Sequence, residues 1–162
     1  MERVVQCLPV EGLTTKASEI LTDLLENGDS LLKDIHLDAI MRYISSDAGR
    51  DFVVRHVEGD SEEDVMTFME LVLGFCAFRR ESLLLGTLDK DQSEILLSYL
   101  DSMFRAPGFP GVEDRLAPML LDWWAQAADD VQEMTPDENE EDQLLHARQV
   151  LANAILNCLN RL

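Results

Sequence analysis

Apolar residues recur along most of the chain with the spacing of an α-helix, and almost no segment alternates as a strand would. Leu13, Ala17 and Leu24 lie at positions i, i+4 and i+11 of one such pattern, which ends at Asn27-Gly28, a pair typical of a left-handed helix cap. The chain is therefore predicted to be all-α. Helices are expected over residues 14–26, 34–57, 62–80, 91–105, 113–133 and 140–161.

Two of these predicted helices depart from a simple one-sided pattern. Ser45, Ser46 and Gly49 indicate a break inside the helix over 34–57. The helix over 62–80 has apolar residues around most of its circumference, which is typical of a helix sandwiched between neighbours. Its main apolar stripe consists of Val65, Phe68, Met69, Val72, Phe75 and Cys76. The apolar residues off that stripe are Leu71, Leu73 and Phe78.

The helix over 113–133 follows a segment rich in proline and glycine and has one apolar face. We predict Trp124 to be buried between neighbouring helices and Trp123 to be partly buried at the seam between two repeats. Pro118 predicts that this helix begins late or is kinked. The predicted core positions of the face are Leu116, Leu120, Trp123, Trp124, Ala127 and Val131.

The order of the predicted helices fits either a helical bundle or a solenoid of helix pairs. Segments 34–57 with 61–80, and 90–106 with 112–133, form pairs that recur at about 50 residues, the scale of HEAT-type repeats. The periodicity alone leaves the two architectures open. In the last helix, the residues expected to face inward are Leu144, Leu151, Ala154, Ile155, Cys158 and Leu162.

The strongly acidic balance limits which partners are plausible. Thirty-two acidic residues against 13 Lys and Arg give a formal net charge of -19, which disfavours nucleic acids and anionic membranes and favours basic partners. Residues 129–142 contain eight acidic residues and no Lys or Arg. Two interpretations of that segment stay open: a solvated loop between helices, or a contact for a basic ligand.

Other global features indicate a soluble intracellular protein. The longest apolar run, Leu71–Phe78, is far shorter than the ~20 residues of a membrane helix, and the start of the chain lacks a basic signal region. Cys7, Cys76 and Cys158 are widely spaced, so we interpret them as small hydrophobic residues in a reducing compartment rather than a disulfide framework.

The segment that most resembles a metal-binding loop departs from the required pattern. Asp89, Asp91 and Ser93 have the spacing of calcium ligands, but Glu94 stands where the loop needs glycine and Leu100 where it needs an acid. Neither a zinc or di-iron spacing nor a phosphate-binding or nucleophile motif is present elsewhere, so no cofactor, no metal and no enzymatic activity are expected. The three histidines of the chain, none of them in such a spacing, are His36, His56 and His146.

The segment PGFPGVEDRLAPMLLDWWAQAADDV resembles the middle of a karyopherin-β nuclear transport receptor of the importin 13 and transportin-3 group. KASEILTDLLENG and SEEDVMTFMELVLGFCAFRRESLL resemble helices of preceding repeats more faintly. Trp123 stands where the family more often has Phe, Gly111 is an extra residue, and Pro118 replaces a small polar residue. The positions that match are Pro110, Val112, Glu113, Trp123, Trp124, Asp129, Asp130 and Val131.

The resemblance implies a HEAT-type α-solenoid fragment of about three helical repeats over residues 1–162. It further implies a non-enzymatic scaffold that shuttles between cytoplasm and nucleus and binds basic protein cargo, with Ran GTPase expected only for the full-length receptor. In this family the helices matching 14–26, 62–80 and 113–133 line the concave surface. Their acidic positions, expected to form a cargo-binding wall, are Glu62, Glu63, Asp64, Glu113, Asp114, Asp122, Asp129 and Asp130.

Two other classes of protein explain the same periodicities. A compact helical-bundle adaptor unrelated to transport would have the same one-sided helices. An enzyme whose acidic residues come together only in the fold is the third possibility, although acids clustered at helix starts are usually solvated.

Overall fold

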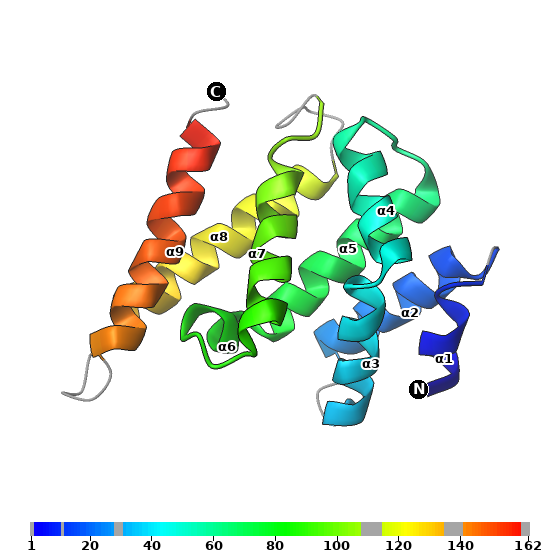
Figure 1. Ribbon diagram of the computed structural model, residues 1–162, viewed down its shortest axis with the longest axis horizontal. Coiled ribbons are helices and arrows are strands. Elements are labelled where there is room, and N and C mark those ends of the chain that lie inside the picture. Colours follow the sequence, from blue (N-terminus) through cyan, green and yellow to red (C-terminus); the bar gives the residue numbers. More distant parts are fainter. Residues whose placement is uncertain (1, 11, 28–30, 108–114, 135–140, 160–162) are drawn as a thin grey trace. The chain divides into compact units, whose positions relative to one another are not determined.

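The computed structural model describes residues 2–10, 12–27, 31–107, 115–134 and 141–159, and over these residues the fold is all-α, as predicted (Figure 1). Helices and short connections account for every described segment, and no strand occurs among them. The helices are α1 (Glu2–Cys7), α2 (Thr14–Asn27), α3 (Asp34–Ile44), α4 (Asp47–Val57), α5 (Glu63–Phe78), α6 (Arg80–Leu84), α7 (Lys90–Met103), α8 (Leu116–Glu133) and α9 (Glu141–Leu159).

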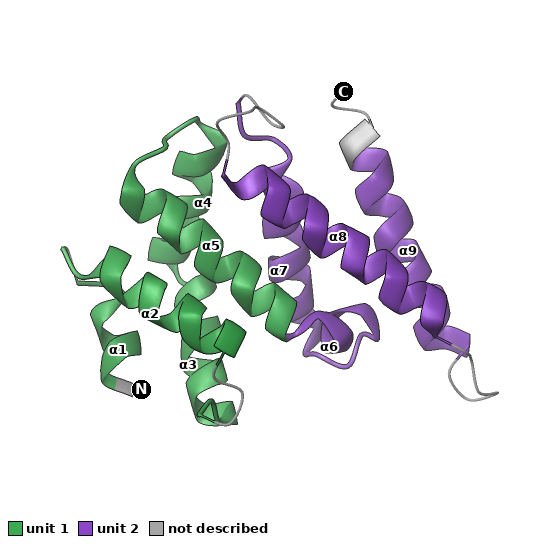
Figure 2. Cartoon of the chain, turned by 180° about the vertical axis from the view of Figure 1, so that it is seen from behind, with its two compact units in different colours: residues 1–78 green, residues 79–162 purple. Residues whose placement is uncertain are grey.

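The chain divides into two compact units, Met1–Phe78 and Arg79–Leu162, which Figure 2 shows in different colours. Within the first unit, α1 packs against α2 to form a first helix pair. The broken helix made of α3 and α4 forms the second pair with α5, and α4 packs against α5. The second pair stacks on the first, because α1 also contacts α3 and α2 packs along α5. This stacking of successive helix pairs is the packing of a HEAT-like segment.

The centre of the first unit is α5, which packs against both α2 and α4. Its wide apolar surface is buried as the sequence predicted. The ring of Phe68 is fully buried, stacked on Phe52 at 4.8 Å and in edge contact with Tyr43 at 5.9 Å between centroids. The residues of α5 that are buried are Val65, Thr67, Phe68, Met69, Leu71, Val72, Leu73, Gly74, Phe75 and Cys76.

The predicted break in the second helix separates α3 from α4. The Ser46 hydroxyl accepts a hydrogen bond from the Gly49 amide (3.2 Å) and donates one to the Tyr43 carbonyl (2.7 Å). Ser46 therefore caps the start of α4 while holding the end of α3. A Cβ atom at Gly49 would lie 2.6 Å from the Tyr43 carbonyl oxygen, so this turn requires glycine.

The second unit begins with a short helix that the sequence did not predict. α5 ends at Phe78 instead of continuing to residue 80, and α6 buries Leu83 and Leu84. Five residues are too few to show a helical period, and α1 was missed for the same reason. α6 packs against both α8 and α9, and α8 packs against α9.

The starts of α7 and α8 explain two features of the sequence. The Asp89 carboxylate accepts hydrogen bonds from the Asp91 and Gln92 amides (3.0 and 3.3 Å), so the calcium-like DKD segment caps α7. α8 begins at Leu116, later than the predicted residue 113. Pro118 is then the third residue of the helix, where a missing N–H costs no internal hydrogen bond.

One helix exposes residues that the sequence placed in the core. On α9, Leu144 and Ala154 are buried as expected, but Ile155 is 57% exposed, so its predicted inward orientation is wrong. Leu145 is 64% exposed. The helix has apolar residues on more than one face, and its contacts with α6 and α8 cover only part of them. The side chains of Cys158 and Leu162 lie outside the described residues.

Candidate protein-interaction site

The apolar face of α8 anchors the second unit and thereby fixes which of its side chains point outward. Its buried residues include Trp123, at 3% exposure, and recur at the spacing of one helical face. Acidic side chains occupy the opposite, exposed surface. The predicted core positions found buried are Leu116, Leu120, Trp123, Ala127 and Val131.

The two tryptophans have the reverse of the predicted order of burial. Trp123 is in the core, whereas Trp124 is only half-buried. Successive residues point about 100° apart around a helix, and the buried stripe is centred on Trp123, so Trp124 falls on its flank. The rings meet edge to face with centroids 4.6 Å apart, and both indole N–H groups are buried with no hydrogen-bond partner in the described structure.

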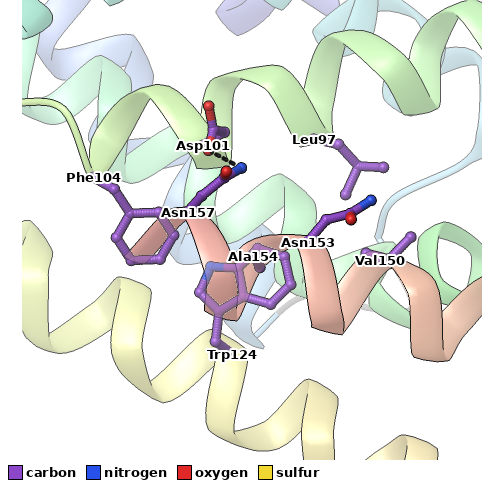
Figure 3. A pocket seen from close by; sticks show the side chains of 8 residues that line it. All are labelled: Leu97, Asp101, Phe104, Trp124, Val150, Asn153, Ala154 and Asn157. Atoms are coloured by element: carbon purple, nitrogen blue, oxygen red, sulfur yellow. Dashed lines mark hydrogen bonds between the residues drawn. The ribbon is translucent and has the colours of Figure 1, made fainter. Parts of the chain in front are cut away.

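Trp124 lines a cavity of about 150 Å³ between α7, α8 and α9. Figure 3 shows its indole reaching from α8 toward Ala154 of α9, with Phe104 beside it. The Asn157 amide donates a hydrogen bond to Asp101 (2.6 Å) at the rim, and Arg105 forms an ion pair with the other Asp101 oxygen (2.6 Å). The cavity is lined by Leu97, Asp101, Phe104, Trp124, Val150, Asn153, Ala154 and Asn157.

Two of the predicted acidic residues near the start of α5, Glu62 and Asp64, meet one arginine at the end of α4. Arg55 forms ion pairs with Asp60 (2.7 Å), Glu62 (3.2 Å) and Asp64 (3.2 Å). Its guanidinium also lies over the ring of Phe52, 5.5 Å from the centroid. These acids are therefore already paired within the chain.

The backbone holds two of these carboxylates in place. Oδ1 of Asp60 accepts from the Glu62 amide (2.9 Å), and Oδ1 of Asp64 accepts from the Val65 amide (2.9 Å). The Glu62 amide and, less strongly, the Arg55 charge outweigh the effect of burial and lower the pKa of Asp60 below its usual value. Asp60 was not among the predicted binding residues, although its oxygens organise the turn.

The acids on α8 are arranged differently. Asp130 forms an ion pair with Arg80 of α6 (2.6 Å), and the same arginine donates a hydrogen bond to Gln126 (2.9 Å). Gln126 in turn donates a hydrogen bond to Asp122. Because the Gln126 amide is neutral, this bond leaves the charge of the Asp122 carboxylate in place. Asp129 is exposed. The outer surface of α8 therefore keeps negative charge at Asp122 and Asp129.

The predicted acidic wall is thus divided among different environments. Glu62 and Asp64 meet at Arg55, Asp130 meets Arg80, and Glu63 is exposed at the start of α5. Glu113 and Asp114 lie outside the described residues. A role of these acids in binding cargo stays a prediction. Sequence reasoning missed Arg55 and Arg80, for which the only signal was the scarcity of basic residues near so many acids.

The described residues hold little that would support other chemistry. Burial raises the pKa of the Cys76 thiol, so this cysteine stays protonated as a core residue, and Cys7 donates to the Arg3 carbonyl (3.2 Å). Over the described parts of the chain, no group of three or more His, Cys, Asp or Glu side chains is placed to bind a metal ion. Among the described helices, none has the length and apolar character needed to cross a membrane.

Comparison with known proteins finds a distant similarity to an importin beta-like protein. The chain is 25% identical over 135 residues to the importin beta-like protein kap111 of Schizosaccharomyces pombe. The match covers 80% of this chain but 13% of that relative, so the chain spans a small part of its length. No family model matches the chain, and no solved structure matches it significantly. The chain therefore has a distant, partial similarity to an importin β-like protein, at a level that does not distinguish a subfamily.

Proposed function

We propose that this chain is a non-enzymatic scaffold segment of a nuclear transport receptor of the karyopherin-β family, related to the importin 13 and transportin-3 group. The observation that carries the proposal is the similarity to an importin β-like protein over 80% of the chain. The stacked helix pairs of the first unit support it, because solenoid receptors are built from such pairs. In the complete receptor the protein moves between cytoplasm and nucleus, and Ran GTPase is a partner of that complete receptor.

The proposed partner of this segment is a basic protein cargo. The net charge of -19 favours such partners. On the outer surface of α8, neither Asp122 nor Asp129 forms an ion pair with a Lys or Arg side chain of the described structure. Charge of this kind mainly raises the association rate and makes binding sensitive to salt. Affinity requires apolar contacts in addition.

Calorimetric titration of the protein with a small panel of basic nuclear domains, at low and moderate salt, tests this proposal. An acidic domain serves as the negative control. The double variant Asp122→Asn/Asp129→Asn is expected to bind a basic domain about threefold to tenfold more weakly than the natural chain.

The matched control is Asp38→Asn/Asp51→Asn, which removes the same charge from exposed positions on α3 and α4. We expect this control to bind nearly as well as the natural chain. Equal weakening in both double variants would show that net charge alone attracts the domain, and the proposed α8 contact would be abandoned. That outcome is the one expected of a helical adaptor without a dedicated cargo surface.

A further inference from the structure

We propose that Arg55 closes the acidic turn between α4 and α5 to basic partners. The arginine acts as an internal competitor, an autoinhibitory contact that pairs with Asp60 and Asp64 and with one oxygen of Glu62, whose side chain stays 76% exposed. Partner binding is then left to the acids on α8. This inference rests on the proposed function in one respect, because it decides which of the acidic residues a basic partner contacts.

The carboxylates of Asp60 and Asp64 have both oxygens engaged. In Asp60, Oδ2 accepts from Arg55 Nε (2.7 Å) while Oδ1 accepts from the Glu62 amide (2.9 Å). In Asp64, Oδ2 accepts from Arg55 Nη1 (3.2 Å) while Oδ1 accepts from the Val65 amide (2.9 Å). A basic side chain from a partner must therefore compete with Arg55 for either carboxylate.

Arg55 is also held in position from its other side. Its guanidinium lies over the Phe52 ring, and that ring stacks on the fully buried Phe68. The Arg55 side chain is 29% exposed, so much of it has already lost its water. Because this cation is tethered and ordered beforehand, it outcompetes a free lysine or arginine, which loses more freedom on binding.

A charge-matched pair of variants tests the inference. Arg55→Gln and Arg50→Gln each remove one positive charge from α4, but Arg50 is exposed and its ion pair with Asp47 is long (3.8 Å). The probe is a short oligolysine peptide, titrated by calorimetry at low salt. If Arg55 masks the turn, Arg55→Gln binds the peptide about threefold to tenfold more tightly than Arg50→Gln. Equal dissociation constants for the two variants would overturn the inference.

A second substitution locates the gain. Adding Asp64→Asn to Arg55→Gln is expected to remove most of the increase in affinity, because the exposed carboxylate is then gone. In the natural background Asp64→Asn should change affinity by less than about twofold, since Arg55 already covers this position. A loss there as large as that of Asp122→Asn/Asp129→Asn would contradict the inference, and this comparison holds even if Arg55→Gln does not fold.

The outcomes also separate the inference from the proposed function. If the α8 double variant binds oligolysine as well as the natural chain, the proposed α8 contact fails. The comparison of Arg55→Gln with Arg50→Gln is read independently of that result. Arg55→Lys, which keeps the charge, should bind like the natural chain, and thermal unfolding followed by circular dichroism checks that each variant is folded.

Discussion

The helices α5 and α8 both carry apolar and acidic residues, but the two helices lie in different environments. α5 buries ten of its 16 residues, because α2 and α4 cover it from two sides. α8 buries six of its 18 residues and has its acidic side chains on the outer surface. A wide apolar helix therefore serves as a core element, whereas a one-sided helix leaves a surface on which charge is available for binding.

The same contrast applies to the charges of the two helices. Acids at the start of α5 are gathered around Arg55, where they hold a turn together. On α8, as far as the described residues show, Asp130 alone is paired with an arginine. Acidic residues that look alike in the sequence thus differ in the structure. Those near Arg55 stabilise a turn, whereas Asp122 and Asp129 are exposed.

The largest expected effect is on the core of the first unit. Replacing Phe68 with alanine removes a fully buried ring that contacts Phe52 and Tyr43, and should lower the free energy of unfolding by about 3–5 kcal/mol. The matched change Ile155→Ala, on the exposed surface of α9, should cost less than about 1 kcal/mol. Denaturant unfolding followed by circular dichroism measures both, and similar losses would mean that α9 is covered in solution.

A smaller difference is expected between the two tryptophans of α8. Trp123→Ala should cost about 3–5 kcal/mol as a core change, while Trp124→Ala, beside the cavity, should cost about 1–2 kcal/mol. The same unfolding experiment compares the two variants directly. A greater loss for Trp124→Ala would restore the order predicted from the sequence.

The contribution of the acidic turn should depend on pH. Because the folded pKa of Asp60 is lowered, its carboxylate stabilises the fold fully above its unfolded pKa of about 3.9, and this contribution is lost as the pH falls through the lower folded pKa. Asp60→Asn should therefore be less stable than the natural chain at neutral pH. The two unfolding curves should converge in acid, and a gap that persists below the folded pKa would rule out this role.

The smallest effects are expected on the outer surface of α8. Asp129→Asn should change the free energy of unfolding by no more than about 0.5 kcal/mol, because the side chain is exposed. Asp130→Asn breaks the ion pair with Arg80 and should cost up to about 1 kcal/mol. Thermal unfolding of both variants in one buffer provides the test, and a large loss for Asp129→Asn would show that this surface is structural.

Much of the fold could be read from the order of the residues. The period of apolar positions located the long helices, and Ser46 with Gly49 located the break between α3 and α4. α6 could not be found this way, because five residues do not show a period. Ile155 was misplaced because the sequence shows that a residue is apolar but not whether another helix covers it.

The sequence by itself determined the all-α class, the central helix α5 and the acidic character of the surface, since these follow from local spacing and composition. Only the tertiary structure decided that Trp123 is buried more deeply than Trp124, and that Arg55 and Arg80 reach particular carboxylates. The physical reason is that burial and ion pairing depend on which neighbouring side chains the packing of other elements places within a few ångströms.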